Sequence, residues 1–138
     1  MSVILERVGF APDYVNYVES LDMQSRLHAE VAARARQNTI LLLEHEPVIT
    51  AGKRTEDHEY PTDRATPVVK IDRGGKLTWH GPGQLTGYPI LKLPEPLDVV
   101  AYVRLLEEII MNVLAQLGIK GERVEGRSGV WILGDGIT

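Results

Sequence analysis

The chain has 138 residues, a net charge of −4, 43% hydrophobic and 25% charged residues, and no cysteine. This size and composition are ordinary for a single soluble domain spanning residues 1–138, and dispersed basic residues outnumbered by acidic ones argue against a nucleic-acid partner. Disulfides, thiolate metal sites and a cysteine nucleophile are excluded within the chain. The start lacks a signal-peptide run and no segment reaches the ~18 apolar residues of a membrane span, so we expect a cytoplasmic location.

The first third of the sequence predicts a strand, a helix and a second strand. Residues 3–8 form a short apolar, branched run that is typical of a strand. Pro12 and Asp13 resemble a helix start, and a mostly apolar face at helical spacing then extends to about Gln37. The face consists of Tyr14, Val18, Leu21, Ser25, His28, Ala32 and Ala35. Four consecutive aliphatic residues within 39–44 predict a buried strand.

The middle of the sequence predicts a long loop, a hairpin and an edge strand. Residues 52–67 are polar and charged, which indicates a loop, and long loops in small domains are usually functional or mobile. Residues 68–72 predict a short strand that turns at a Gly-Gly pair, with residues 77–79 as the return strand. A further strand is expected over residues 84–93, where Pro89 requires an edge or a bulge.

The last third predicts one long helix and two short strands. Asp98 is a plausible N-cap and Gly118 a stop for a helix with one broad apolar face. The face consists of Val99, Tyr102, Val103, Leu106, Ile109, Ile110, Val113, Leu114 and Leu117. Strands are expected over residues 119–124 and 129–133, with a turn at 134–136. The order of elements predicts an α/β (α+β) domain with a mixed sheet and two helices packed against it.

Residues suited to chemistry are concentrated between Asp72 and Gln84. These thirteen residues include four glycines, two cations, a histidine and a glutamine. Paired glycines let backbone N–H groups approach a ligand and reach positive φ without steric cost. Arg73 offers a forked donor, His80 can donate or accept, and the Gly-Pro-Gly that follows His80 can aim Gln84. Two tight turns around a hairpin would account for an isolated Gly-Gly pair, but not for the whole string.

The string resembles a pattern of the lipoyl(octanoyl) transferases, the octanoyl-transferring enzymes of lipoate biosynthesis. Their pattern is Arg-Gly-Gly, four residues, then His-x-Pro-Gly-Gln. The matching positions are Arg73, Gly74, Gly75, His80, Pro82, Gly83 and Gln84. Supporting likeness lies in residues 42–52, 87–90, 103–108 and 127–131. The chain therefore resembles the N-terminal portion of this family, over nearly all of its length.

The resemblance implies the fold of the lipoate and biotin protein ligase catalytic domain, with the C-terminal part missing. It implies transfer of an octanoyl group from octanoyl-acyl carrier protein to a lysine of lipoyl domains, those of 2-oxoacid dehydrogenase complexes or of the glycine cleavage protein. The implied substrate-binding residues are Arg73, Gly74, Gly75, Lys76, Leu77, Thr78, Trp79 and His80. Leu77 and Trp79 would help to line an acyl channel, and N–H groups near the glycines would hold the thioester carbonyl. No metal and no cofactor is expected.

The family's nucleophile is not among these residues. The resemblance implies a cysteine that takes the acyl group and a lysine in a K-x-x-A-[IV]-G motif that lowers the cysteine's pKa, both downstream of a Gly-Val-Trp strand. We therefore assign no catalytic residue within the chain and expect a truncated enzyme, rather than half of a split protein or a pseudoenzyme. Two alternatives remain: a non-catalytic binding module for acyl carrier or lipoyl domains, and an ATP-dependent lipoate or biotin ligase. A ligase would show a His-Asp-x-Gly-Asn continuation, whereas this chain has His-Gly-Pro-Gly-Gln.

The histidines outside this segment are interpreted as structural or solvated. His45 and His58 have carboxylates nearby in the sequence, but their spacing matches no standard metal-ligand motif. Residues 55–60 are therefore expected to form a charged, solvated lid. His28 lies on the predicted helical face, where a packed or partly buried histidine is expected.

Two charged pairs are also interpreted from their positions. Glu107 and Glu108 lie on the long predicted helix, and surface charge is the expected role of both. Lys53 and Arg54 follow directly after an apolar segment, at the start of the long loop. We expect this basic pair to meet the acidic acyl carrier protein, since opposite charges speed encounter between partners.

Overall fold

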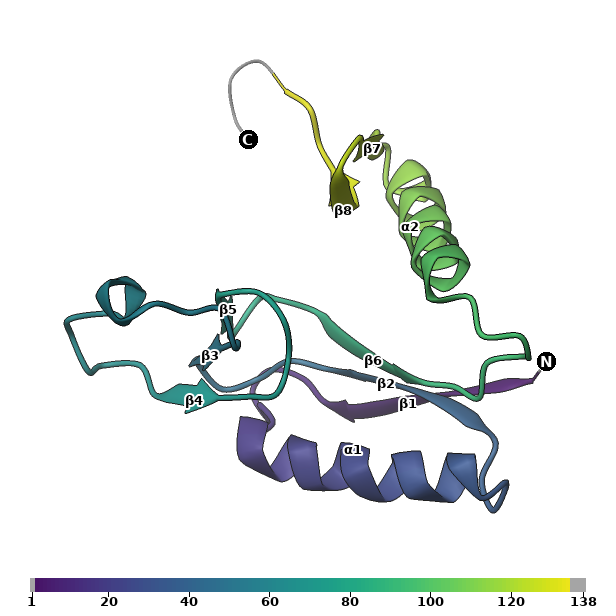
Figure 1. The fold of residues 1–138 in the computed structure, drawn as a ribbon, viewed down its shortest axis with the longest axis horizontal. Helices are drawn as coiled ribbons and strands as arrows, with labels where there is room; N and C mark the ends of the chain where they lie inside the picture. Colours follow the sequence, from purple (N-terminus) through teal and green to yellow (C-terminus); the bar gives the residue numbers. More distant parts are fainter. Residues whose placement is uncertain (1, 135–138) are drawn as a thin grey trace. The chain divides into compact units, whose positions relative to one another are not determined.

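The computed structural model describes residues 2–134, and the chain forms two compact units, Met1–Lys92 and Leu93–Thr138 (Figure 1). The mixture of helices and mixed sheets confirms the predicted fold class. That the whole chain is one domain stays a prediction. Beyond Gly134, the turn expected at 134–136 lies outside the described residues. Within residues 2–134, no helix is long and apolar enough to cross a membrane.

The larger unit contains a three-stranded sheet that α1 covers on one face (Figure 1). Its strands are β1 (Val3–Gly9), β2 (Asn38–Leu43) and β6 (Thr86–Ile90), in the order β1-β2-β6. β1 pairs with β2 in parallel, and β6 pairs with β2 antiparallel. The expected strands are confirmed, and Pro89 indeed lies in an edge strand, where a missing N–H breaks no ladder on the outer side.

Helix α1 (Tyr17–Ala32) is shorter than expected at both ends. It begins after Asn16, whose side-chain oxygen accepts from the N–H groups of Val18 and Glu19 at 3.0 and 3.2 Å. The predicted start at Pro12 is wrong because residues 11–13 form a turn, closed by a hydrogen bond from the Asp13 N–H to the Phe10 carbonyl, and Val15 forms a β-bridge with His45. The helix ends well before Gln37, since the chain reverses at Arg34, which has a φ of 59°.

The buried face of α1 also differs from the predicted one. The buried residues are Tyr17, Ser20, Leu27 and Val31. Val18 of the predicted face is 53% exposed, and His28 is exposed rather than packed. Leu27 and Val31 instead pack with Leu41 and Ile90 of the sheet to form the core. The alanines near the end of the helix produced a misleading apolar pattern, because alanine tolerates exposed helical positions well.

A second three-stranded sheet in the same unit is centred on a strand that the sequence analysis missed. Its strands are β3 (Val48–Ala51), β4 (Val68–Lys70) and β5 (Leu77–His80). β4 pairs with β3 in parallel and β5 pairs with β3 antiparallel. The predicted hairpin between residues 68–72 and 77–79 is therefore wrong, because β3 lies between these strands. The loop after β3 is long, as expected, and contains the short 3₁₀ helix η1 (Asp57–Glu59).

The smaller unit consists of helix α2 (Val99–Gln116) and a hairpin of β7 (Glu122–Val124) and β8 (Arg127–Trp131). The Asp98 carboxylate caps the helix by accepting from the backbone N–H of its third residue at 2.9 Å. Gly118 has a φ of 75°, which only glycine adopts readily, and ends the helix. Both ends of the predicted helix are thus confirmed.

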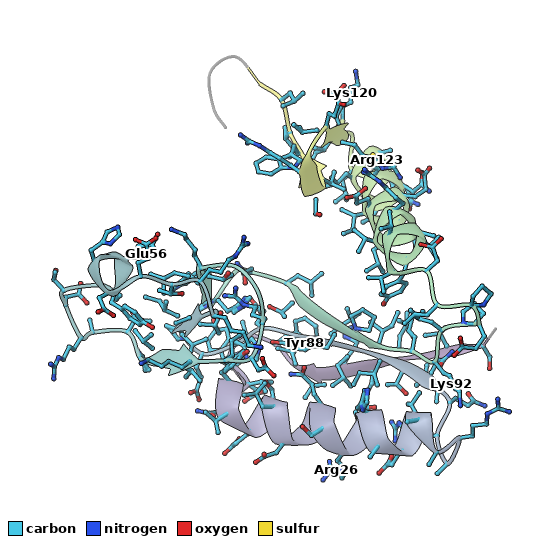
Figure 2. The ribbon with its side chains drawn as sticks, viewed as in Figure 1. Arg26, Glu56, Tyr88, Lys92, Lys120 and Arg123 are labelled. Atoms are coloured by element: carbon cyan, nitrogen blue, oxygen red, sulfur yellow. The ribbon has the colours of Figure 1, made fainter. Side chains whose placement is uncertain are left out.

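Glu107 holds the smaller unit together, so its expected role as surface charge is wrong. It is only 2% exposed, and its Oε2 accepts from Arg104 and Arg123, each at 2.9 Å. Its Oε1 accepts from the backbone N–H of Gly129 at 2.9 Å, and this bond with the two arginines lowers the pKa of Glu107. The carboxylate therefore joins α2 to the hairpin (Arg123 is labelled in Figure 2). Glu108 is exposed, as expected.

Candidate functional site

The candidate site lies in the larger unit, where the chain crosses twice between its two sheets. Residues 44–47 connect the end of β2 to the start of β3, and residues 81–85 connect the end of β5 to the start of β6. These two connections bring His45 beside His80, with ring centroids 5.7 Å apart. Tyr88 of β6, labelled in Figure 2, lies beside His45 at a ring distance of 5.8 Å. Residues far apart in the sequence thus meet at one junction.

The Arg73 guanidinium ties the glycine turn to the second sheet. Its Nη2 donates to the carbonyl and hydroxyl oxygens of Thr50 at 3.2 and 2.9 Å, and to the Thr78 hydroxyl at 2.9 Å. Its Nη1 donates to the Gly74 carbonyl at 2.9 Å. Thr50 is fully buried in the central strand. Arg73 was expected to offer its donors at the mouth of the turn, but it uses them to shape the turn.

The glycine turn folds against the residues that follow β3. The N–H groups of Lys53 and Arg54 donate to the carbonyls of Arg73 and Gly75 at 2.9 and 3.0 Å. The opposite side of the turn is open, because a Cβ built on Gly74 would have no heavy atom within 4 Å. Gly75 has a φ of 85°, so a side chain there would strain the backbone. The turn therefore leaves room for a ligand to approach its backbone closely.

Two lysines around the turn, Lys53 and Lys76, are paired with carboxylates. Lys76 Nζ lies 2.6 Å from Glu59 and 3.8 Å from Glu56 of the loop around η1 (Glu56 is labelled in Figure 2). The hydrogen bond from Lys76 helps to lower the pKa of Glu59, after the larger effect of the Glu56 backbone N–H. Lys53 forms an ion pair with Asp72. The charged loop and the basic pair therefore brace the turn, and docking of an acyl carrier at Lys53 stays a prediction.

His45 is fully buried and has hydrogen bonds on both ring nitrogens. Its Nδ1 lies 2.9 Å from the Val15 carbonyl and its Nε2 2.7 Å from the Tyr88 hydroxyl. Because a carbonyl only accepts, Nδ1 carries the proton and Nε2 accepts from Tyr88. Burial lowers the pKa of His45, which keeps the ring neutral, and raises the pKa of Tyr88 to about 12.

His80 lies at the edge of this aromatic cluster. Its ring is stacked on Tyr17 at 6.2 Å with an interplanar angle of 8°. Its Nδ1 lies 2.6 Å from Gln84 Oε1, and Gln84 Nε2 donates to the Trp79 carbonyl at 3.1 Å. The structure therefore brings together His80 and Gln84, the two ends of the second half of the motif.

Glu44 holds the connection that carries Gln84, a role that the sequence analysis missed. Its two carboxylate oxygens accept from the backbone N–H groups of Ala11 and Gly83 at 2.9 and 2.8 Å. These two bonds lower the pKa of Glu44, that from Ala11 most. No pattern in the sequence could indicate this role, because both donors are backbone groups of segments distant in sequence.

The two histidines weighed as metal ligands have other surroundings. His45 is enclosed in the cluster, whereas His58 is exposed and lies 3.3 Å from Glu56. Among residues 2–134, no three or more histidine, aspartate or glutamate side chains are grouped closely enough to hold a metal ion. The surroundings of the two histidines therefore give no support to a shared metal site.

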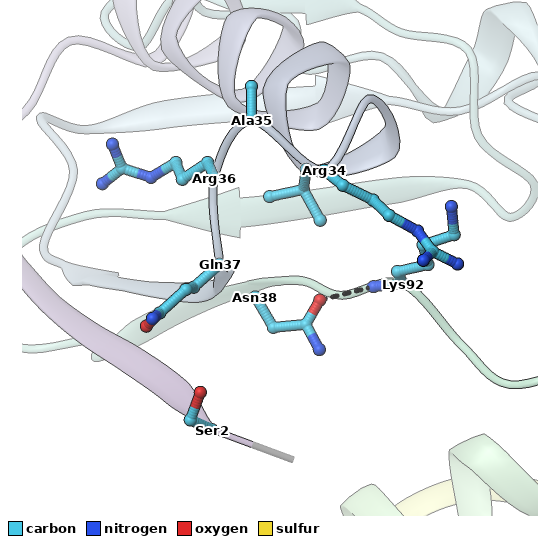
Figure 3. Close-up of a pocket in the computed structure, with 8 residues that line it drawn as sticks. Ser2, Arg34, Ala35, Arg36, Gln37, Asn38 and Lys92 are labelled. Carbon is cyan, nitrogen blue, oxygen red and sulfur yellow. Dashed lines mark hydrogen bonds between the residues drawn. The ribbon is translucent and has the colours of Figure 1, made fainter.

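The apolar residues expected to line an acyl channel differ in exposure. Trp79 is 46% exposed and its ring lies over Gly81, where an added Cβ would be 2.3 Å from the ring. Leu77 is half-buried. Residues 73–80 do not line the pocket of about 380 Å³ whose lining includes Arg34, Asn38 and Lys92 (Figure 3). That pocket is polar and basic, so it does not suit an octanoyl chain.

The family follows from a comparison with known proteins. Residues 16–137 match the model of the lipoyl protein ligase A/B catalytic domain. The chain belongs to this family, which confirms the resemblance found in the sequence.

Among curated proteins, the chain is similar to octanoyltransferases. It is 63% identical over 131 residues to that of Leifsonia xyli subsp. xyli, covering 95% of this chain and 58% of the relative. It is 60% identical over 129 residues to that of Streptomyces coelicolor, covering 94% and 48%. The chain therefore spans about half the length of the curated relatives that it matches.

Solved structures with the same fold are lipoate protein ligases. A bipartite lipoate protein ligase from Thermoplasma acidophilum, described with its E2 lipoyl domain, has a TM-score of 0.61 at 17% identity, covering 91% of this chain and 49% of that one. Lipoate-protein ligase A bound with ATP has a TM-score of 0.62 at 17% identity, covering 91% and 51%. At this identity the likeness shows the fold alone, and it confirms the fold that the resemblance implies.

Substitution of Gly52 by alanine should displace the glycine turn. A Cβ there would lie 2.6 Å from the Gly75 carbonyl and 2.8 Å from the Gly74 carbonyl, and overpacking of this kind costs about 1–3 kcal/mol. We expect faster hydrogen exchange at the Lys53 and Arg54 amides, which donate to the turn. Gly74→Ala is the matched control, because its Cβ enters open space. Equal protection of these amides in both variants would contradict the described packing.

The neutral, buried state of His45 should make stability depend on pH. The pKa of His45 is lowered from its ordinary value of 6.5, so the unfolded chain binds more protons than the folded chain just below that pH. The free energy of unfolding should therefore fall as the pH decreases from 7 to 5, mainly below about pH 6.5. Urea denaturation at a series of pH values across this range measures the change. His45→Gln should flatten this slope, while His28→Gln, at an exposed position, should keep it. An unchanged slope in His45→Gln would show that another group is responsible.

Proposed function

We propose that this chain supplies the acyl-binding part of an octanoyltransferase of lipoate biosynthesis. The observation that carries the proposal is the complete Arg-Gly-Gly…His-x-Pro-Gly-Gln motif, which folds into an open glycine turn that strand β5 joins to a histidine cluster. Identity of about 60% to proteins named octanoyltransferase supports it. The donor is octanoyl-acyl carrier protein, and the acceptor is a lysine of lipoyl domains, of 2-oxoacid dehydrogenase complexes or of the glycine cleavage protein. A cytoplasmic location is part of the proposal.

The segment proposed to bind the acyl group consists of Arg73, Gly74, Gly75, Lys76, Leu77, Thr78, Trp79 and His80. The open side of the turn at Gly74 gives a thioester carbonyl access to backbone N–H groups. The exposed face of Trp79 offers apolar area to the octanoyl chain, which gains about 25 cal/mol for each Å² removed from water. Arg73 and Lys76 contribute indirectly, because their own contacts hold the turn in shape.

The chemical step needs residues that this chain does not contain. In the mechanism that the resemblance implies, a cysteine takes the acyl group as a thioester, and the 138 residues include no cysteine. Acyl transfer by these residues alone is therefore not expected. Their proposed contribution is to bind and orient the acyl thioester.

An ATP-dependent lipoate ligase is the second candidate, because the same fold occurs in a lipoate-protein ligase bound with ATP. Two observations favour the transferase. The identity to that ligase is 17%, against 60% or more for the octanoyltransferases of Leifsonia and Streptomyces coelicolor. His80 is followed by Gly-Pro-Gly-Gln instead of the Asp-x-Gly-Asn continuation of the ligases. A non-catalytic module that binds acyl carrier or lipoyl domains is a third candidate, consistent with the lack of cysteine.

Acyl binding can be measured on the chain itself by titrating the ¹⁵N-labelled protein with octanoyl-pantetheine. We expect the Gly74 and Gly75 amides and the Trp79 indole to shift, and pantetheine without the acyl group to leave them unchanged. Trp79→Ala should weaken binding about tenfold, since loss of apolar contact worth about 1.5 kcal/mol corresponds to that factor. Leu117→Ala, which alters a side chain 70% exposed in the smaller unit, is the matched control.

Other results of the titration would favour the alternatives. Shifts that require ATP and free lipoate or octanoate would support the ligase. Shifts caused by a lipoyl domain but not by octanoyl-pantetheine would support the binding module. The absence of any shift at residues 73–80 with octanoyl-pantetheine would contradict the proposed site.

A further inference from the structure

The Gln84 side chain connects the His80 ring to the backbone of Trp79, which precedes His80 in strand β5. Its Oε1 lies 2.6 Å from His80 Nδ1, and its Nε2 donates to the Trp79 carbonyl at 3.1 Å. No role for Gln84 follows from its place at the end of the motif. Its two contacts nevertheless determine the chemical state of His80.

The direction of each hydrogen bond follows from the groups involved. The Trp79 carbonyl can only accept, so the amide end of Gln84 that faces it must be the NH₂ group. The carbonyl oxygen of Gln84 then faces His80, and this oxygen can also only accept. His80 Nδ1 must therefore carry the proton, and in the neutral ring Nε2 holds a lone pair.

We infer that Gln84 is a positioning residue that holds His80 in its Nδ1–H form and so presents Nε2 as a hydrogen-bond acceptor at the junction between the two sheets. Among the residues that the structure describes, none forms a hydrogen bond with His80 Nε2. An acceptor at this place fits an amide N–H of a pantetheine-type acyl thioester, or an N–H of the amine that receives the acyl group. The identity of this ligand rests on the proposed function, whereas the tautomer does not.

The backbone around Gln84 is built to aim its side chain. The Gln84 N–H donates to the Gly81 carbonyl at 3.1 Å, which closes a tight turn. Gly83 has a φ of 86°, which favours glycine, and its N–H donates to the Glu44 carboxylate at 2.8 Å. The Gln84 backbone is therefore held in place, so that its side-chain amide reaches His80 in a defined orientation.

His45 provides an internal comparison for His80. Its Nδ1 also carries the proton, because it faces the Val15 carbonyl, but its Nε2 is occupied by the Tyr88 hydroxyl. The two neighbouring rings thus have the same tautomer. His45 Nε2 accepts a hydrogen bond from Tyr88, whereas His80 Nε2 has no hydrogen-bond partner among the described residues. Free imidazole side chains in water favour the opposite, Nε2–H form, so the shared state is a distinctive signature.

The test is ¹⁵N NMR of the imidazole rings in this chain at about pH 8, where ordinary histidines are neutral. The His80 and His45 signals, assigned through His80→Gln and His45→Gln, should both report the Nδ1–H form. Gln84→Leu should lower the ratio of Nδ1–H to Nε2–H at His80 by roughly 2- to 10-fold, the range for loss of one hydrogen bond. The same variant should leave His45 unchanged, which shows that the cluster is intact.

Two further variants separate positioning from a general effect on the fold. Gln84→Glu keeps an acceptor toward Nδ1 and should retain the Nδ1–H form of His80. Gln37→Leu, at an exposed position outside the cluster, should leave both rings unchanged. If Gln84→Leu does not fold, the tautomer of His80 in the wild-type protein and in Gln84→Glu still tests the inference.

The inference is overturned if wild-type His80 is found in the Nε2–H form, or if folded Gln84→Leu retains the Nδ1–H form. Neither measurement requires an acyl ligand. A failure of octanoyl-pantetheine to bind would therefore count against the proposed function and leave the assignment of the tautomer standing.

Discussion

The shape of residues 73–80, the segment proposed to bind the acyl group, depends on the hydrogen bonds of the Arg73 guanidinium to Thr50 and Thr78. Thr50 lies in the central strand β3 and Thr78 in β5, so one side chain connects the glycine turn to both strands. A guanidinium suits this role because it presents five N–H donors in a rigid plane, whereas a lysine ammonium is a single flexible point. Burial raises the pKa of Tyr17, and the positive charge of Arg73 partly offsets this rise. Arg73 thus acts on the turn and on the aromatic cluster together.

In the connection between the two sheets, two adjacent residues differ in charge state: Glu44 is ionised and His45 is neutral. Glu44 is kept ionised, because backbone N–H groups bond to both carboxylate oxygens and lower its pKa. His45 is kept neutral, because burial lowers its pKa. At neutral pH Glu44 is therefore a fixed anion that anchors the 81–85 connection, and the adjacent His45 is an uncharged imidazole beside the His80 ring.

The sequence predicted best those features that depend on residues close together in the chain. The motif at residues 73–84 is unbroken, so the family and the proposed site followed from it directly. Helix α2 followed as well, since Asp98, the apolar period and Gly118 agree on its bounds. These features depend on local backbone chemistry, which is visible in a single sequence.

The errors concern features that depend on tertiary partners. Strand β3 has only four residues, and its place between β4 and β5 is decided by pairing across distant segments. The buried face of α1 is chosen by contact with Leu41 and Ile90, and the alanines give no strong opposing signal. Glu107 resembles any exposed helical glutamate until Arg123 and Gly129 are folded against it. In each case the missing information is a partner remote in sequence.

Hydrogen exchange in Arg73→Lys tests most directly whether this one side chain shapes the segment proposed to bind the acyl group. Lysine keeps the charge but cannot reach Thr50, Thr78 and Gly74 together. We expect faster exchange of the amides of residues 73–80 than in the wild-type chain, with unchanged protection in the sheet formed by β1, β2 and β6. Equal protection of residues 73–80 in both proteins would contradict it, because the turn would then hold its shape without the guanidinium.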